Sequence, residues 1–343
     1  MIEGRFCVFK RVVLLGLLIA IGCLAGFAAD DGNIAVYAHN DTIMVFWDPS
    51  DTFSNEAVVL HNVYETLLRY DPVTDEVIPV LATSFEVSED GLTWTFNLRE
   101  GVTFHTGGTM NAQAVKASIE RTIDRGKGAS FIWDPVASIC VVDEYTVAFH
   151  LAYQYPMDII AASAYAAYIF DPDYADHDWF TAGHDSGTGP YTIDSFTGSE
   201  MIVVKRFDEY WGGWDGEHFE TIVFQTVEED GTRRMMIESG EADYVRKLTT
   251  TELEALRSNP TVDVVASGSY ENLLAVYNMA KTDGSPISNP LIRKAISYAI
   301  PYDDIIEGVV GGYAEKARGV VPQGLWGYSN RVKQYTYLSL IHI

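Results

Sequence analysis

The stretch GHDSGTG, residues 183 to 189, brings the most reactive side chains of the chain close together. His184, Asp185 and Ser186 are the residue types of a hydrolase triad, in which histidine takes the serine proton and aspartate orients the histidine. Triad members normally converge from separate elements, so three adjacent residues favour a polar loop. We therefore assign no catalytic residue.

Gly187 and Gly189 could instead expose backbone amides to a phosphate. Phosphate loops of that kind add a lysine and a helix whose N-terminus faces the anion. Here Pro190 and the strand-like YTI follow. We expect a turn in which the glycines permit unusual dihedral angles and Pro190 begins an edge strand.

Other sequence motifs with known chemistry are missing. The chain contains no Walker A, dinucleotide-binding, zinc-protease, nucleophile-elbow or EF-hand pattern. Its histidines lack ligand spacing and only Cys140 lies beyond the first 29 residues, so we predict no metal site and no cofactor. A net charge of -25 argues against binding of nucleic acid.

Aromatic side chains are the remaining candidates for ligand contact. Any one of them could pack in a core, but together they favour a cleft lined by rings. Those in or near predicted loops and strand ends are Phe46, Trp47, Phe131, Trp133, Tyr165, Tyr168 and Tyr270.

The first 29 residues are typical of an export signal. Basic residues precede an apolar run at 12–24, and small residues follow. Cleavage after Ala25 or Ala28 would release a soluble protein, whereas AIGC resembles a lipoprotein box that would attach a lipid to Cys23. Both routes lead to the periplasm or the extracellular space.

The elements that would position a cleft alternate between helix and strand. Apolar residues at helical spacing predict a helix within 54–71, capped by Ser54 or Asn55. A second helix follows Asn111 and ends near Gly126. This helix lies between two predicted β-hairpins, whose turns fall at 90–91 and 143–144.

The rest of the chain continues the same alternation. Thr251 and Glu254 have the spacing of a helix capping box. The pattern indicates a mixed α/β protein of more than one unit. Predicted strands are 33–38, 201–207, 221–227 and a buried one at 271–279, and predicted helices are 232–240, 250–259, 289–300 and 302–312.

Several stretches resemble, in the same order, the extracellular solute-binding proteins of ABC importers, specifically the peptide/nickel-binding family 5. They extend from about Trp47 to Tyr328, and their collinear order makes the resemblance specific. The stretches are WDPSDTFSNEAVVLHNVYETLLRYDP, LATSFEVSEDGLTWTFNLREGVTFHTGGTMNAQAVKASIER, VVDEYTVAFHL, GTGPYTI, YWGG, IESGEADY and NPLIRKAISYAIPYDDIIEGVVGGYAEKARGVVPQGLWGY.

The resemblance implies an α/β, two-lobed fold of the periplasmic-binding-protein type (class II, cluster C) with an inserted subdomain. After the signal at 1–29, lobe one would comprise 31–70 and 187–276. The inserted subdomain would be 71–186, and 277–337 would begin lobe two.

The resemblance also implies a binding function. Family members take peptides most often, sometimes nickel complexes or oligosaccharides, and deliver them to a membrane permease driven by ATPase subunits. We expect a monomer that binds an oligopeptide or dipeptide. The positions that correspond to cleft-facing regions are Trp47, Phe131, Trp133, Tyr165, Tyr270 and Asn272.

The end of the chain departs from the family pattern. Typical members continue well past residue 337, whereas here LSLIHI at 338–343 resembles translated adaptor sequence. We expect a truncated gene with an incomplete second lobe. Two other classes stay open: an exported hydrolase, which would lose turnover on changing Ser186 or His184, and a surface-layer or adhesion protein, which repeats would mark.

Overall fold

The computed structural model describes residues 33–40, 47–198, 200–279 and 284–338. The predicted signal with Cys23 and most of the predicted tail lie outside the described residues. The chain divides into two compact units: unit 1 ends at Lys247 and unit 2 begins at Leu248. The predicted limits of the two lobes and of the inserted subdomain stay predictions.

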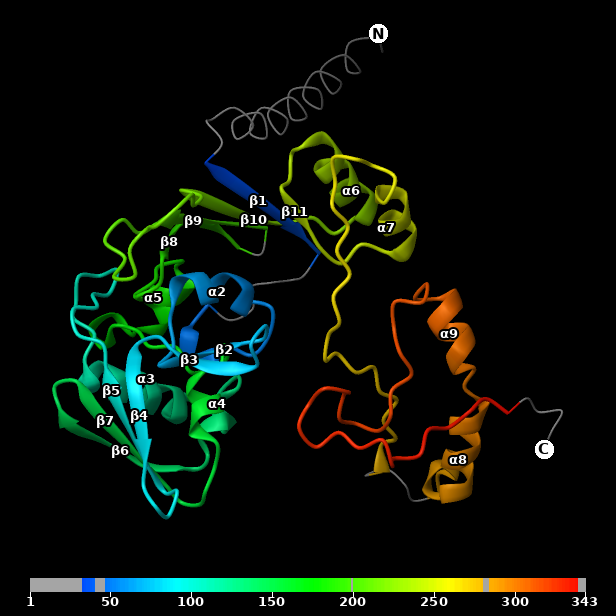
Figure 1. Cartoon of the computed structure of the whole chain (residues 1–343), viewed down its shortest axis with the longest axis horizontal. Helices are drawn as coiled ribbons and strands as arrows, with labels where there is room; N and C mark the ends of the chain where they lie inside the picture. Colours follow the sequence, from blue (N-terminus) through cyan, green and yellow to red (C-terminus); the bar gives the residue numbers. More distant parts are fainter. Residues whose placement is uncertain (1–32, 41–46, 199, 280–283, 339–343) are drawn as a thin grey trace, which may run out of the picture. The chain divides into compact units, whose positions relative to one another are not determined.

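The first sheet of unit 1 joins segments that are far apart in the sequence (Figure 1). Strand β1 runs parallel to β10 and β11, and β8, β9 and β10 pair antiparallel. The chain therefore returns to the sheet of β1 after Pro190, and the strands predicted at 33–38, 201–207 and 221–227 are confirmed. In order across the sheet, the strands are β11 (Tyr244–Val245), β1 (Ile34–His39), β10 (Thr221–Thr226), β9 (Met201–Arg206) and β8 (Tyr191–Thr197).

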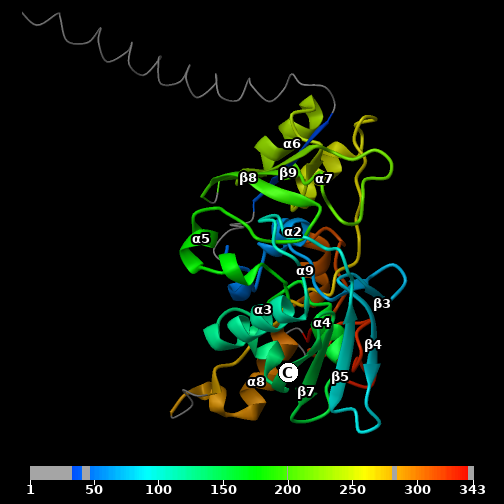
Figure 2. The same ribbon diagram turned by 90° about the vertical axis from the view of Figure 1, so that its left-hand side faces the viewer.

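A second, antiparallel sheet consists of the two predicted hairpins, which are confirmed. Helix α3 (Ala112–Arg125) covers one face of this sheet (Figure 2), where Val115 and Ile119 pack with Phe96 and Phe149. The order of the strands is β4 (Ala82–Val87), β5 (Thr93–Leu98), β7 (Thr146–Leu151) and β6 (Val136–Asp143), and a separate small sheet pairs β2 (Leu68–Asp71) with β3 (Glu76–Pro79).

Both ends of α3 follow the prediction. The Asn111 side chain accepts a hydrogen bond from the Ala114 backbone amide at 3.0 Å, which satisfies one of the free amides of the first turn. At the other end Gly126 adopts φ 60°, the left-handed conformation that glycine reaches without strain.

The helix predicted within 54–71 is wrong in its extent. Helix α2 is only Ala57–Val63, its N-cap is Glu56 and not Ser54 or Asn55, and the chain is extended from Tyr64. The apolar residues are buried as the pattern required, but in two different cores: Leu60 and Val63 in one, Leu67 and Leu68 in the other. The segment passes from one core to the other with an extended backbone after Val63.

Short helices complete unit 1. The helix predicted at 232–240 is confirmed as α6 (Asp230–Ser239). The others are η1 (Pro49–Asp51), η2 (Ser130–Trp133), α4 (Met157–Ala161), η3 (Pro172–Tyr174) and α5 (His177–Thr181).

Unit 2 contains the three helices expected there. Asn289 caps α8 by accepting from the Leu291 amide at 2.9 Å, as its position before Pro290 predicted. The capping box is wrong, because α7 begins after Thr249 and Glu254 bonds to Arg257 instead. The helices are α7 (Thr250–Leu256), α8 (Pro290–Ala299) and α9 (Tyr302–Gly308), with a short η5 (Pro286–Ser288).

The buried strand predicted at 271–279 is wrong. The described part of the chain offers this segment no ladder partner, and the Leu273 side chain is 95% exposed. An apolar run with strand propensity becomes a buried strand only when neighbouring backbone pairs with it and side chains cover it. Among all the described residues, no helix is both long enough and apolar enough to cross a membrane.

Candidate functional site

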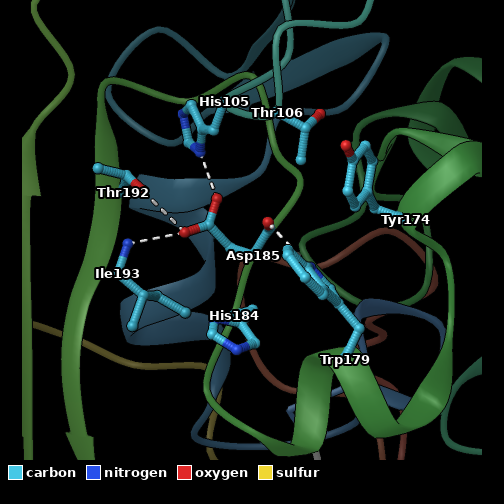
Figure 3. Close-up of a pocket in the computed structure, with 8 residues that line it drawn as sticks. All are labelled: His105, Thr106, Tyr174, Trp179, His184, Asp185, Thr192 and Ile193. Carbon is cyan, nitrogen blue, oxygen red and sulfur yellow. Dashed lines mark hydrogen bonds and ion pairs between the residues drawn. The ribbon is translucent and has the colours of Figure 1, made fainter.

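Asp185 of the GHDSGTG loop connects this loop to His105 and to the start of β8 (Figure 3). One carboxylate oxygen of the buried Asp185 pairs with Nδ1 of His105, which lies after β5. The other accepts hydrogen bonds from the Ile193 amide at 2.8 Å and the Thr192 hydroxyl at 2.9 Å. Within the described residues the hydroxyl of Ser186 is buried without any hydrogen-bond partner, so no described base activates it.

Both ring nitrogens of His105 face oxygen acceptors. Nδ1 faces Asp185, and Nε2 lies 2.8 Å from the carbonyl oxygen of Gly189. Burial would raise the pKa of Asp185, but hydrogen bonds from His105, Thr192 and Ile193, together with the electrostatic effect of His105, outweigh it and hold that pKa below its usual range.

The glycines of the loop are required by close packing. A Cβ on Gly187 would lie 2.0 Å from the carbonyl oxygen of Val63, and one on Gly189 would lie 2.5 Å from that of Asn62. The Gly189 amide donates to Val63 oxygen at 2.9 Å. The loop therefore lies against the end of α2. The predicted unusual dihedral angles are wrong, because neither Gly187 nor Gly189 has a positive φ, and it is the lack of space for a side chain that requires glycine here.

Glu65 joins this loop to the YWGG stretch. Its carboxylate accepts from the Thr188 hydroxyl at 2.9 Å, the Tyr210 hydroxyl at 2.9 Å and the Trp211 indole at 2.7 Å. Burial raises the pKa of Glu65 despite these three donors. The network lies within unit 1, and its hydrogen bonds connect the segment after α2 to the chain on both sides of β8 and β9.

Three exposed aromatic side chains of unit 1 lie on adjoining segments. Phe53, Phe131 and Tyr165 are 40% to 59% exposed. We call them the aromatic junction, because hydrogen bonds tie their segments together. Thr52 accepts from the Ala129 amide at 3.0 Å through its carbonyl and from the Ala166 amide at 2.7 Å through its hydroxyl.

Trp133 is buried and connects two of the segments that carry the aromatic junction. Its indole nitrogen donates to the Ala166 carbonyl at 2.6 Å, and its ring stacks on Phe149 with centroids 5.9 Å apart. Among the predicted ligand residues, the structure thus brings Phe131, Trp133 and Tyr165 together, with Trp133 buried and the other two exposed. Sequence reasoning missed Phe53, whose only signal was its place in the family-like stretch WDPSDTFSN.

The other predicted ligand residues lie elsewhere. Trp47 is buried in the core beneath the first sheet, with its ring edge-on to Phe196. Tyr270 and Asn272 belong to unit 2, where Tyr270 is exposed and the Asn272 amide donates to the Gly319 carbonyl at 3.2 Å. The assignment of all six as ligand contacts stays a prediction.

Asp48, Asp51 and His177 form a group with the spacing of metal ligands. Two arginines already compensate its charge, however. Arg121 donates to both carboxylate oxygens of Asp48 at 2.7 Å, and Arg125 donates to Asp51 at 2.6 Å. Burial would raise the pKa of Asp48, yet hydrogen bonds from Arg121, His177 and the Ser50 amide, together with the Arg121 charge, lower it. The group is an ion-pair network that ties η1 to α3.

Comparison with known proteins now gives the family. Residues 76–338 match the family model of bacterial extracellular solute-binding proteins, family 5. The chain belongs to this family. The resemblance seen in the sequence is confirmed, and so is the α/β fold of the two-lobed periplasmic-binding-protein type, which the solved family members share.

Several members of the solute-binding family are similar over most of this chain. The glutathione-binding protein GsiB of Shigella dysenteriae is 30% identical over 329 residues, which are 95% of this chain and 62% of that protein. The chain therefore spans about three fifths of the length of the curated relatives it matches.

Two solved structures extend the comparison. The periplasmic binding protein DppA of Helicobacter pylori, in complex with peptide STSA, is 28% identical with a TM-score of 0.76, covering 89% of this chain and 63% of that one. A nickel ABC transporter protein from Bacillus halodurans is 28% identical with a TM-score of 0.66, covering 89% and 61%.

Proposed function

We propose that the chain belongs to the solute-binding component of an ABC importer that captures a short peptide and delivers it to a membrane permease coupled to ATPase subunits. The observation that carries the proposal is the aromatic junction, Phe53, Phe131 and Tyr165, in a family 5 member whose relatives bind glutathione and the peptide STSA. Exposed rings on rigid segments suit a ligand cleft.

The mechanism proposed is ligand-stabilised closure of two lobes. A ligand that touches both lobes only when they are closed shifts the open–closed equilibrium by that extra contact energy. The protein works as a monomer outside the cytoplasm, either free or attached through a lipid on Cys23. Nickel complexes are the second candidate ligand, because the Bacillus halodurans relative is a nickel transporter protein.

Isothermal titration calorimetry with peptide STSA and glutathione tests this function. We expect saturable binding to the chain, weakened about tenfold or more in the double variant Phe131→Ala, Tyr165→Ala, because aromatic anchors carry much of the binding energy. Tyr153→Ala removes an exposed ring of unit 1 that does not belong to the junction and should change nothing.

Two results would count against peptide capture. One is the absence of saturable heat with either peptide. The other is an equal loss in the Tyr153→Ala control. Saturable binding of a nickel–histidine complex in place of both peptides would favour the second candidate.

A further inference from the structure

We propose that Lys127 binds a carboxylate of the captured peptide and so makes the site selective for peptides that carry an anionic group next to the aromatic junction. This role of Lys127 rests on the proposed function and adds a residue that determines its specificity. Lys127 lies on the loop between α3 and η2, shortly before Phe131, and its side chain is 60% exposed.

The loop that carries Lys127 packs against one of the segments of the aromatic junction. The Ala129 amide donates to the Thr52 carbonyl at 3.0 Å. Gly128 has φ 54°, and a Cβ there would lie 2.2 Å from the carbonyl oxygen of Asp51, so only glycine permits this approach. The backbone of the loop is therefore fixed beside the junction, and the Lys127 side chain starts from a defined position.

The ammonium group of Lys127 still has hydrogen bonds to donate. Its Nζ lies 4.0 Å from a carboxylate oxygen of Asp51, which is beyond hydrogen-bond distance. Asp51 accepts its hydrogen bonds from Arg125 instead, through Nε at 2.6 Å and also through Nη2. In the described part of the chain no group accepts a hydrogen bond from this ammonium, which has three to donate.

The positive charge of Lys127 is not compensated by the ion-pair network beside it. In that network the carboxylates of Asp48 and Asp51 face the guanidinium groups of Arg121 and Arg125. These four charges balance, so Lys127 contributes an exposed positive charge. Since a net charge of -25 repels anions at long range, an anionic ligand needs a local cation of this kind.

A peptide supplies the group that matches this ammonium. Every unmodified peptide ends in a carboxylate, and acidic side chains carry another. An ammonium donates charge-assisted hydrogen bonds to either carboxylate, and such bonds are stronger than neutral ones. Exposed rings can cover the apolar parts of a peptide, whereas a placed charge fixes its orientation.

Isothermal titration calorimetry with three matched peptides tests the role of Lys127. STSA has a terminal carboxylate, C-terminally amidated STSA has none, and amidated Ser-Thr-Asp-Ala has only a side-chain carboxylate. We expect Lys127→Gln to weaken binding of STSA about tenfold and to leave binding of amidated STSA unchanged, because only the carboxylate loses its partner. Weakening of amidated Ser-Thr-Asp-Ala alone would also support the proposal and would identify a side-chain carboxylate as the group bound.

Two further variants separate the lost contact from other effects. Lys127→Arg keeps a charged donor and should restore most of the affinity for STSA. Lys205→Gln is the matched control, because Lys205 lies on β9 and pairs with Asp194 at 2.6 Å, and it should change nothing.

Three results would overturn the role of Lys127 while the proposed function stands. They are equal weakening of STSA and amidated STSA by Lys127→Gln, no weakening of either carboxylate-bearing peptide, and a Lys127→Arg chain that binds no better than Lys127→Gln. Absence of saturable binding by all three peptides would overturn the proposed function together with the role of Lys127.

Discussion

Helices α3 in unit 1 and α8 in unit 2 carry the same kind of amphipathic sequence in different surroundings. In α3 the apolar residues Val115 and Ile119 are fully buried, whereas Ile123 near the end of the helix is partly exposed. In α8 no residue is buried, and Leu291 is 71% exposed. An apolar stripe predicts that a helix can bury one face, but the stabilisation comes only when another surface covers that face. The sequence signal is the same, and the packing differs.

Hydrogen exchange should show the largest difference between the two helices. Amides of α3 should exchange about a thousandfold or more slowly than those of α8, because buried elements open only with much of the global unfolding free energy. Exchange followed by mass spectrometry, corrected for intrinsic rates, measures this. Equal protection of α3 and α8 would contradict the claim that burial stabilises α3 more than α8.

Two tryptophans give the next largest contrast. Trp133→Ala should cost about 3 to 5 kcal/mol of unfolding free energy, because it empties a core site and removes the hydrogen bond to Ala166. Trp326→Ala, at a fully exposed side chain of unit 2, should change it by about 0.5 kcal/mol or less. Urea titration followed by circular dichroism compares them, and similar costs would contradict the contrast.

One glycine substitution in each unit should give a smaller difference in unfolding free energy. Gly187→Ala should cost about 1 to 3 kcal/mol, since the added carbon would overlap the Val63 carbonyl oxygen and force the backbone apart. Gly268→Ala in unit 2 meets nothing within 4 Å, so it should be neutral or slightly stabilising. Urea midpoints of the two variants test this. A Gly187→Ala chain as stable as Gly268→Ala would exclude the close approach.

Acid titration should give the smallest effect. The pKa of Asp185 is lowered in the folded chain, so its stabilisation is complete above the unfolded pKa of about 3.9 and is lost as pH falls through the folded value. Asp185→Asn should therefore flatten the decline of stability below pH 4 or so.

The matched acid variant lies in unit 2. Hydrogen bonds from Tyr313 and Arg257 lower the pKa of Glu254, but its carboxylate is exposed and solvent screens the pair. Glu254→Gln should leave the acid slope almost unchanged. Equal flattening in the two variants would show that burial does not decide the effect.

Part of the candidate site could be predicted from the sequence. Phe131, Trp133 and Tyr165 were candidates as aromatic residues in or near predicted loops, at positions that correspond to cleft-facing regions of the family. Hydrogen bonds between their segments do bring them together. That Phe131 is exposed while Trp133, two residues later, is buried could not be predicted. Nor could the pairing of His105 with Asp185, because nothing local to either residue specifies the other.

The sequence by itself determined the hairpins, α3 with its caps, and α8, because those signals depend on residues within a few positions of each other. It also determined the family, through the order of several stretches along the chain. Only the tertiary structure decided that α2 stops at Val63, that 271–279 is not a strand and that Asp185 meets His105. The physical reason is that burial and pairing depend on which distant part of the chain packs against a residue. A local sequence pattern can indicate that a residue will be buried or paired, but it does not identify the residue that contacts it.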